Sequence, residues 1–192
     1  RASAWAEPGC ALGRYVVSRR EGCKLVATYH NHAPEAGVGK PVSHDEVLQG
    51  CQHINEKILK VIRHGNDWKL WVLCDRDPVE NWVDGRVTLL GDAAHPMLQY
   101  YAQGACMAME DAVCLSHMMD RHGGDIDQAF AAYNEQRMIR TARVQLGARA
   151  IGDHIYHPDG AHARVRNHIM GNMTVEDYYD SLEWLYGGTG LD

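Results

Sequence analysis

The sequence has no apolar run close to the roughly 18 residues that a membrane-spanning helix needs, so a transmembrane segment is not expected. It also lacks an excess of positive charge, because 19 lysines and arginines stand against 25 aspartates and glutamates. Affinity for nucleic acid depends mainly on neutralising phosphates with Lys and Arg. The formal net charge of −6 therefore disfavours a nucleic-acid partner.

Disulfide and metal-binding patterns are missing as well. The six cysteines are widely spaced and form no C-x-x-C pair, which favours reduced, mostly buried thiols in a cytoplasmic protein. The tightest histidine pairs are His30 with His32 and His154 with His157, and neither has carboxylates or thiolates at a metal-binding spacing. No metal site is predicted, and a His-rich metal hydrolase is only a third alternative.

What the sequence does contain is the composition of a soluble globular protein. Its 192 residues are 45% hydrophobic and 23% charged, which suits one full domain or two small ones. The chain starts at Arg1 rather than Met, without a signal or transit pattern. We therefore expect a trimmed or partial chain.

The first third predicts a sheet with one covering helix. Residues Tyr15–Ser18 and Lys24–Tyr29 are strand-like and flank a Gly-containing turn, which indicates a β-hairpin. After a loop, Ser43 and Glu46 form a capping-box pattern at the start of an amphipathic helix. The apolar face of that helix comprises Val47, Cys51, Ile54, Ile58 and Ile62. A further strand is predicted over Trp68–Cys74.

The remaining chain predicts a buried strand, a loop and three helices. Arg86–Leu90 is a short apolar run that ends at Gly91, and a loop continues to Gln103. A largely apolar helix, expected to be buried, follows from Gly104, and a long one runs over 126–151 behind an Asp125 cap. The expected inward faces are Ala105, Ala108, Ala112, Leu115 and Met119 in the first helix, and Phe130 and Tyr133 in the second. A Thr174-x-x-Asp177 box begins the last helix, which ends near Tyr186.

The stretch from Gly91 to Ala112, GDAAHPMLQYYAQGACMAMEDA, carries the chemical signal. It places the carboxylate of Asp92 at the end of a predicted strand and backbone N–H groups at the start of a helix. An Asp there can accept hydrogen bonds from a polyol, and the helix start stabilises negative charge on a ring or phosphate. This combination suits an extended cofactor, although Gly-Asp after a strand is also an ordinary turn.

Together with Asp75-Arg76-Asp77-Pro78 and Gly85-Arg86-Val87 upstream, this stretch resembles the second flavin-binding motif of the group A FAD-dependent aromatic hydroxylases. That family includes the salicylate and hydroxybenzoate monooxygenases, and the resemblance extends loosely from Trp5 to Tyr186. The sequence is most similar to the 3-hydroxybenzoate 6-hydroxylases at three further places. These are Gln103-Gly104-Ala105-Cys106, Tyr156-His157-Pro158 and Trp184-Leu185-Tyr186-Gly187.

The resemblance implies a mixed α+β (α/β) fold that is part of the para-hydroxybenzoate-hydroxylase-like architecture. Residues 1–76 would belong to the substrate-binding sheet, 77–121 to the second FAD motif and 122–192 to C-terminal helices. The N-terminal G-x-G-x-x-G that binds the ADP half of FAD in this family does not occur in this sequence. We therefore expect the C-terminal part of the enzyme, preceded by an N-terminal FAD-binding half.

The implied activity is hydroxylation of a small phenolic acid by a flavoprotein that uses FAD, NADH or NADPH, and O₂. The first expected reaction is the conversion of 3-hydroxybenzoate to gentisate, and salicylate is the second candidate substrate. The family also makes a homodimer possible. The alternative is a non-catalytic fragment or binding remnant that cannot hold FAD alone.

The resemblance also assigns residues. It implies that Asp92 binds the ribityl chain of FAD and that the backbone at Gly104, Ala105 and Cys106 faces the pyrimidine edge, with Gly91 and Gln103 completing the cofactor set. Gln99 and Tyr15 become the substrate-side, catalytic residues. Their ordinary readings are a solvated loop amide for Gln99 and a core or edge-strand tyrosine for Tyr15.

Two positions depart from the family pattern. Ala11 stands where a His is expected four residues before Tyr15, and Tyr101 replaces a loop glycine. Without the His, the family's deprotonation of the substrate phenol by that residue is not expected here. Tyr101 is expected to alter the loop beside the flavin.

Three further features have more than one interpretation. Arg76 either pairs with a carboxylate, positions backbone on the pyrophosphate side, or forms a surface ion pair. His95 is interpreted as a structural residue of its turn rather than as a functional one. A solvated helix face is favoured over a basic patch for Arg137, Arg140 and Arg143.

Overall fold

The computed structural model describes residues 3–7, 10–16, 22–29 and 35–191. The chain divides into two compact units, each made of two stretches of sequence. The sheet unit comprises Arg1–Leu73 and Ile151–Gly171, and the helical unit comprises Cys74–Ala150 and Asn172–Asp192. Within the described residues, every helix is too short or too polar to span a lipid bilayer.

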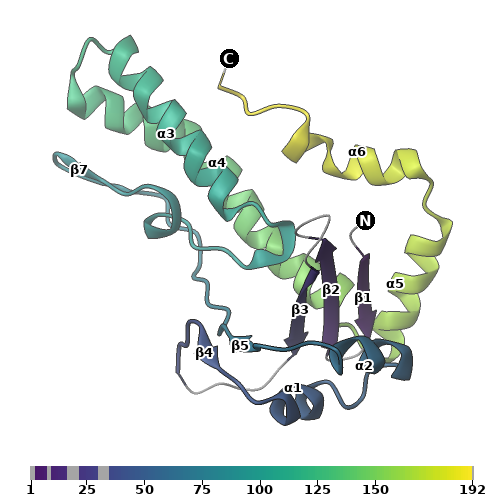
Figure 1. The fold of residues 1–192 in the computed structure, drawn as a ribbon. Coiled ribbons are helices and arrows are strands. Elements are labelled where there is room, and N and C mark those ends of the chain that lie inside the picture. The colour runs from purple at the N-terminus through teal and green to yellow at the C-terminus, as the bar shows by residue number, and fades with distance from the viewer. Residues whose placement is uncertain (1–2, 8–9, 17–21, 30–34, 192) are drawn as a thin grey trace. The chain divides into compact units, whose positions relative to one another are not determined.

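The sheet unit is built on three antiparallel strands in the order β1, β2, β3, seen as adjacent arrows in Figure 1. They are β1 (Ser3–Glu7), β2 (Cys10–Val16) and β3 (Cys23–Tyr29). The predicted hairpin is confirmed, because Arg14 pairs with Leu25 in the β2–β3 register. The predicted strand end at Ser18 lies outside the described residues, and β1 was not predicted.

Two short helices replace the single helix predicted after Ser43. They are α1 (His44–Gly50) and α2 (Glu56–Ile62). The chain breaks between them because the Asn55 side chain caps α2 by accepting the Lys57 amide at 2.9 Å. The predicted apolar face is nonetheless correct, since all its residues are buried in one core. That core contains Cys10, Leu12, Val47, Cys51, Ile54, Ile58, Leu59 and Ile62.

Shorter elements complete the sheet unit. Strands β4 (Lys40–Pro41) and β5 (Lys69–Leu70) pair antiparallel, so the strand predicted over Trp68–Cys74 is much shorter than expected. A π-helical turn, η3 (Gly152–Tyr156), and helix α5 (Gly160–Asn172) follow the long helix of the other unit, and neither was predicted.

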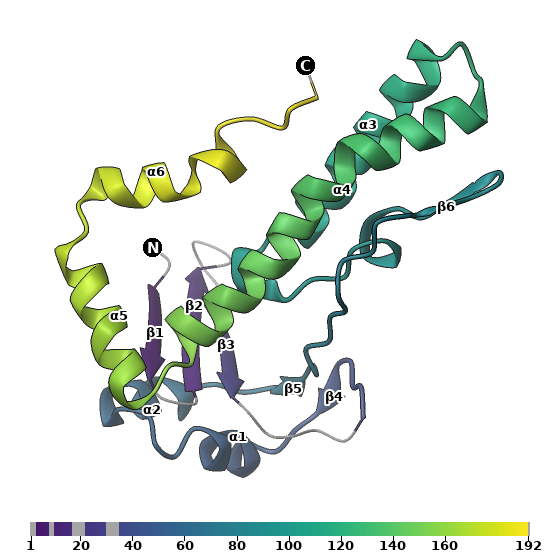
Figure 2. The same cartoon turned by 180° about the vertical axis from the view of Figure 1, so that it is seen from behind.

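The helical unit contains the antiparallel pair α3 (Gly104–Arg121) and α4 (Ile126–Ile151), followed in sequence order by α6 (Val175–Tyr186) (Figures 1 and 2). The predicted bounds of α4 are confirmed, and so is the cap, because Asp125 accepts the Gln128 amide at 3.1 Å. Of the two inward residues predicted on α4, Tyr133 is fully buried and Phe130 only partly.

The predicted buried face of α3 was wrong by one position. The buried residues are Met107, Asp111, Cys114 and Met118, whereas Ala105 and Ala112 are exposed. Met109 and Val113 are also exposed, at 62% and 47%, so the helix is not buried all round as expected. The apolar residues are spread around α3, and periodicity alone could not identify the side that packs on α4.

The prediction of a buried strand over Arg86–Leu90 was also wrong. Only β7 (Val87–Thr88) forms there, in a two-stranded hairpin with β6 (Val83–Asp84), and Val87 is 64% exposed. Gly85 allows this tight turn by adopting φ +54°. The apolar signal came from Leu89 and Leu90, which are partly buried beyond the strand.

Candidate functional site

A tight turn at Gly91 starts the candidate site. The 3₁₀ turn η1 (Gly91–Ala93) places the Gly91 carbonyl to accept the amides of Ala94 and His95, both at 2.9 Å. Gly91 has φ +60°, and a Cβ there would lie 3.1 Å from the Cβ of Ala108. Only glycine combines this backbone angle with so close an approach to α3.

Asp92 lies beside the first residue of α3. Its side chain is exposed, and a Cβ on Gly104 would lie 3.8 Å from Oδ1 of Asp92. Among the described residues, the helix start has no side-chain cap, because Gln103 makes no capping bond. The site thus combines an exposed carboxylate with the partial positive charge of an uncapped helix N-terminus.

Arg76 anchors the backbone of this turn. Its Nη2 donates to the carbonyl oxygens of Ala93 at 2.5 Å and Ala94 at 2.7 Å. Of the interpretations of Arg76 given above, the structure therefore supports the one in which Arg76 positions backbone. That backbone lies next to Asp92. The neighbouring Asp75 and Asp77 pair instead with Arg149, at 2.5 and 2.6 Å.

Beneath the turn lies a buried polar network centred on Asp111. One carboxylate oxygen, Oδ2, accepts the Gly91 amide at 3.0 Å and lies 2.5 Å from Nε2 of His95. The other oxygen accepts Nε of Arg137 at 2.7 Å. Burial alone would raise the pKa of Asp111, but the hydrogen bonds from His95, Arg137 and Gly91 lower it overall. The structural reading of His95 is supported by this position.

The interpretation of Arg137 as part of a solvated face was wrong. Its side chain is 1% exposed and also pairs with Glu110 at 2.8 Å. Arg140 binds Glu110 with two nitrogens, at 2.8 and 2.9 Å, and donates to the carbonyl oxygens of Trp184 and Leu185. Burial would raise the pKa of Glu110, yet the hydrogen bonds of these two arginines lower it.

Aromatic side chains support the loop that precedes α3. Tyr101, in the 3₁₀ turn η2 (Gln99–Tyr101), packs edge-on against Trp184 at 6.0 Å between ring centres. Its ring also lies over Gly147 of α4, where an added Cβ would approach it to 2.7 Å. The guanidinium of Arg143 stacks on Trp184 at 3.9 Å. The departure at Tyr101 therefore has a packing role.

Most of the predicted site residues belong to the helical unit. Gly91 and Gln103 are buried, Gly104 and Cys106 are partly buried, and Asp92, Gln99 and Ala105 are exposed. Tyr15 belongs to β2 of the sheet unit, where it is 47% exposed and its ring lies over Gly13. The structure thus brings Gly91, Asp92 and Gly104 together within one unit.

Sequence reasoning did not find the network around Asp111. The available signal was the Glu110-Asp111 pair within an otherwise apolar helix, which requires cationic partners when buried. In the described part of the chain, no group of three or more His, Cys, Asp or Glu side chains could hold a metal ion.

The comparisons with known proteins agree with this geometry. A family profile described as "FAD binding domain" matches residues 22–149, which is more than half of the chain. The chain belongs to this FAD-binding family. The resemblance identified from the sequence is thereby confirmed at the level of the family, and FAD is its cofactor.

Curated relatives of this FAD-binding chain carry hydroxylase names. 3-Hydroxybenzoate 6-hydroxylase 1 of Aquipseudomonas alcaligenes is 49% identical over 185 residues, which is 96% of this chain and 47% of that protein. 3-Hydroxybenzoate 6-hydroxylase of Polaromonas naphthalenivorans (strain CJ2) is 43% identical over 97% of this chain and 46% of that protein. The chain thus spans just under half the length of these two relatives.

Solved structures confirm the predicted fold class. Klebsiella pneumoniae HpxO, crystallised with FAD and uric acid, has a TM-score of 0.78 at 24% identity, covering 95% of this chain and 46% of that one. A salicylate hydroxylase substrate complex has a TM-score of 0.73 at 22% identity, covering 98% and 48%. The mixed α+β fold of the FAD-binding chain is therefore that of the aromatic hydroxylases.

Proposed function

We propose that the protein is an FAD-dependent monooxygenase that hydroxylates a small phenolic acid, converting 3-hydroxybenzoate to gentisate with NADH or NADPH and O₂. The observation that carries this proposal is the 49% identity to a 3-hydroxybenzoate 6-hydroxylase over 96% of the chain. Salicylate is the second candidate substrate. The non-catalytic alternative is not favoured, because the similarity to enzymes extends over nearly the whole chain.

The residues around Gly91 fit the isoalloxazine and ribityl part of FAD. We propose that Asp92 accepts hydrogen bonds from the ribityl hydroxyls and that the backbone of Gly104, Ala105 and Cys106 faces the pyrimidine edge. The uncapped helix start suits this role because fixed N–H dipoles stabilise negative charge on a reduced ring without reorganisation. FAD, when bound, supplies the redox chemistry and the activation of O₂.

Two exposed polar side chains are proposed to act on the substrate side. Gln99 would hydrogen-bond to the aromatic acid from the loop before α3, and its exposed amide supports this role. Tyr15 would contact the substrate phenol, and the support is its half-exposed ring on the strand face opposite to the buried Leu12. With Ala11 in place of a His, Tyr15 is the only residue of that strand assigned to the phenol.

The division into substrate sheet (1–76), second FAD motif (77–121) and C-terminal helices (122–192) is part of the proposal. An N-terminal FAD-binding half and a homodimer stay predictions from the family resemblance. A cytoplasmic location is proposed because the six cysteines, all within the described residues, are not joined in disulfides there, and Cys10, Cys51 and Cys114 are buried.

The cofactor part is tested with Asp92→Ala in protein expressed from the complete reading frame. We expect this variant to purify with little FAD, because the ribityl chain loses its carboxylate partner. The matched control is Asp84→Ala, which removes another exposed aspartate, in β6 of the same unit. Equal FAD absorbance in Asp92→Ala and the control would reject the assigned role of Asp92.

The reaction is tested by NADH and NADPH oxidation with 3-hydroxybenzoate, and then with salicylate, while gentisate formation is followed by chromatography. We expect Gln99→Ala and Tyr15→Phe to retain FAD and to lose about tenfold or more in kcat/KM, since each removes a substrate hydrogen bond. FAD-loaded protein that forms no hydroxylated product from either acid would overturn the proposed activity.

A further inference from the structure

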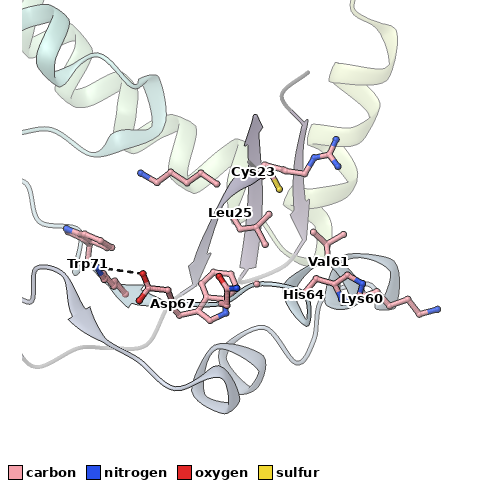
Figure 3. A pocket seen from close by; sticks show the side chains of 14 residues that line it. Cys23, Leu25, Lys60, Val61, His64, Asp67 and Trp71 are labelled. Carbon is pink, nitrogen blue, oxygen red and sulfur yellow. Dashed lines mark ion pairs between the residues drawn. The ribbon is translucent and has the colours of Figure 1, made fainter. Parts of the chain in front are cut away.

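The sheet unit contains a pocket of about 760 Å³, and none of its lining residues has a role in the proposed hydroxylation. Its wall runs from the Cys23 end of β3 across the end of α2 to the segment around β5. Figure 3 shows Cys23 and Leu25 above it, Val61 and His64 at α2, and Asp67 and Trp71 at the opposite side. A volume of this size suits a small-molecule ligand.

The described lining of the pocket carries an excess of positive charge. Three cations, Arg14, Lys60 and Lys69, line it against the single acid Asp67. Lys24 also borders the pocket, but it stands opposite Tyr15 in the β2–β3 register, so its side chain projects to the other face of the sheet. Asp67 offsets only one of the three cations, through a long and exposed contact of 4.0 Å with Lys69. In a chain of net charge −6, such a local excess of cations concentrates anions.

Two buried donors in the pocket wall lack an acceptor among the described residues. Nε of Arg14 and Nε1 of Trp68 are both shielded from solvent and make no hydrogen bond within the described residues. An unsatisfied buried donor is costly, and a native structure normally provides it with a partner. A ligand that brings acceptor oxygens into this pocket would satisfy both donors.

Flat aromatic surface accompanies these donors. Trp68 packs directly on Gly65, where a side chain would collide with the indole, and the adjacent Asp67 holds a left-handed φ of +51° that sets the turn. Trp71 is 54% exposed and also lines the pocket. Exposed indole surface stacks favourably on a planar ring such as a nucleic-acid base.

We propose that this pocket binds a nucleotide, with its phosphates on the cationic residues and its base against the tryptophans. Three cations suit a ligand with several negative charges better than they suit a monocarboxylate. Arg14 and Tyr15 are consecutive residues of β2, so their side chains project to opposite faces of the sheet. The Arg14 side chain therefore lies on the other face of the sheet from Tyr15, the residue proposed to contact the substrate phenol.

Isothermal titration of ADP into the FAD-loaded protein, expressed from the complete reading frame, tests the proposal. We expect one saturable site whose affinity falls with ionic strength and falls about tenfold in both Trp68→Phe and Arg14→Gln. Trp68→Phe is the sharper variant, because it keeps an aromatic ring and removes only the Nε1 donor and part of the indole. The control is Lys57→Gln, an exposed cation of α2 outside the pocket.

Two further ligands separate the phosphate and base contributions. We expect pyrophosphate to bind more weakly than ADP and adenosine to bind more weakly still. Pyrophosphate binding as tightly as ADP would overturn the role of the tryptophans. ADP binding that is absent, or equal in the wild type and both pocket variants, would overturn the site itself.

The thiol of Cys23 gives an independent readout that does not require a variant. Cys23 is exposed at the pocket wall, whereas Cys74 is an exposed thiol of the helical unit. We expect ADP to slow the alkylation of Cys23 several-fold, measured by peptide mass spectrometry, and to leave Cys74 unchanged. Equal rates at Cys23 with and without saturating ADP would contradict the proposal.

Discussion

The carboxylate of Asp111 accepts the backbone amide of Gly91 at 3.0 Å, across twenty positions of sequence. This bond joins the middle of α3 to the turn that presents Asp92. Because the same carboxylate also contacts His95 and Arg137, the turn rests on a buried ionic network rather than on apolar contacts alone. The stability of the helical unit and the geometry of the proposed flavin site are thus coupled through the side chain of Asp111.

Asp111→Asn is expected to destabilise the protein by about 3 kcal/mol, because among the described residues it leaves the buried Arg137 with Glu110 alone as an acidic partner. Urea unfolding followed by circular dichroism measures the change. Asp120→Asn, an exposed acid on the same helix, is the control and should stay within about 0.5 kcal/mol of the wild type. A loss below 1 kcal/mol in Asp111→Asn would show that the network contributes little.

Low pH is expected to lower the free energy of unfolding by protonating the same carboxylates, Asp111 and Glu110. The folded-state pKa values of Asp111 and Glu110 are lowered, so their contribution is complete above the ordinary carboxylate pKa and is lost as the pH falls toward the lowered values. The free energy of unfolding should therefore decrease below about pH 5. Urea titrations between pH 7 and pH 3.5 test this, and Asp111→Asn should show a shallower dependence than the wild type.

Arg76→Gln is expected to weaken FAD binding about tenfold, because the carbonyl oxygens of Ala93 and Ala94 lose charged donors beside Asp92. The measurement is fluorescence titration of the apoprotein with FAD. Arg86→Gln changes an exposed arginine of the β6–β7 hairpin and serves as the control. If both variants bind FAD as the wild type does, Arg76 does not position this turn.

Gly147→Ala is expected to destabilise the protein by about 1–3 kcal/mol, since its Cβ would approach the Tyr101 ring to 2.7 Å in a packed site. Gly171→Ala in α5 is the matched control, with no atom within 4 Å of its added Cβ. That control should stabilise by about 0.5–1 kcal/mol through helix propensity. Thermal unfolding of both variants shows whether each substitution raises or lowers the stability. Stabilisation by Gly147→Ala would contradict the packing described for Tyr101.

Local signals in the sequence predicted several helix boundaries correctly. The boxes at Ser43 with Glu46 and at Thr174 with Asp177 are both formed, because each needs only residues three positions apart. The bounds 126–151 of α4 were likewise predictable from a local cap and a long helical pattern. Even so, the break before Asn55 was missed, since the apolar spacing continues across it.

The buried network could not be predicted because its partners are far apart in sequence. Arg137 reaches Asp111 across 26 positions, and no local pattern distinguishes it from the exposed Arg143, which follows in the same helix. The apolar run at Leu89 similarly gave no sign that its neighbour Val87 would form an exposed hairpin. Gly91 and Asp92 could be singled out as candidates from the sequence because the proposed motif lies within one short stretch, and their role toward the flavin stays a prediction.

Each compact unit is assembled from two stretches of chain that are separated by part of the other. The helical unit needs Trp184 and Leu185, whose carbonyl oxygens bind Arg140, and the sheet unit needs the segment that begins at Ile151. During synthesis, the sheet unit therefore cannot complete its packing until the residues up to Gly171 have followed the first stretch of the helical unit. The helical unit in turn needs residues that are made after Gly171, so the synthesis of each unit is interrupted by part of the other and their folding overlaps in time.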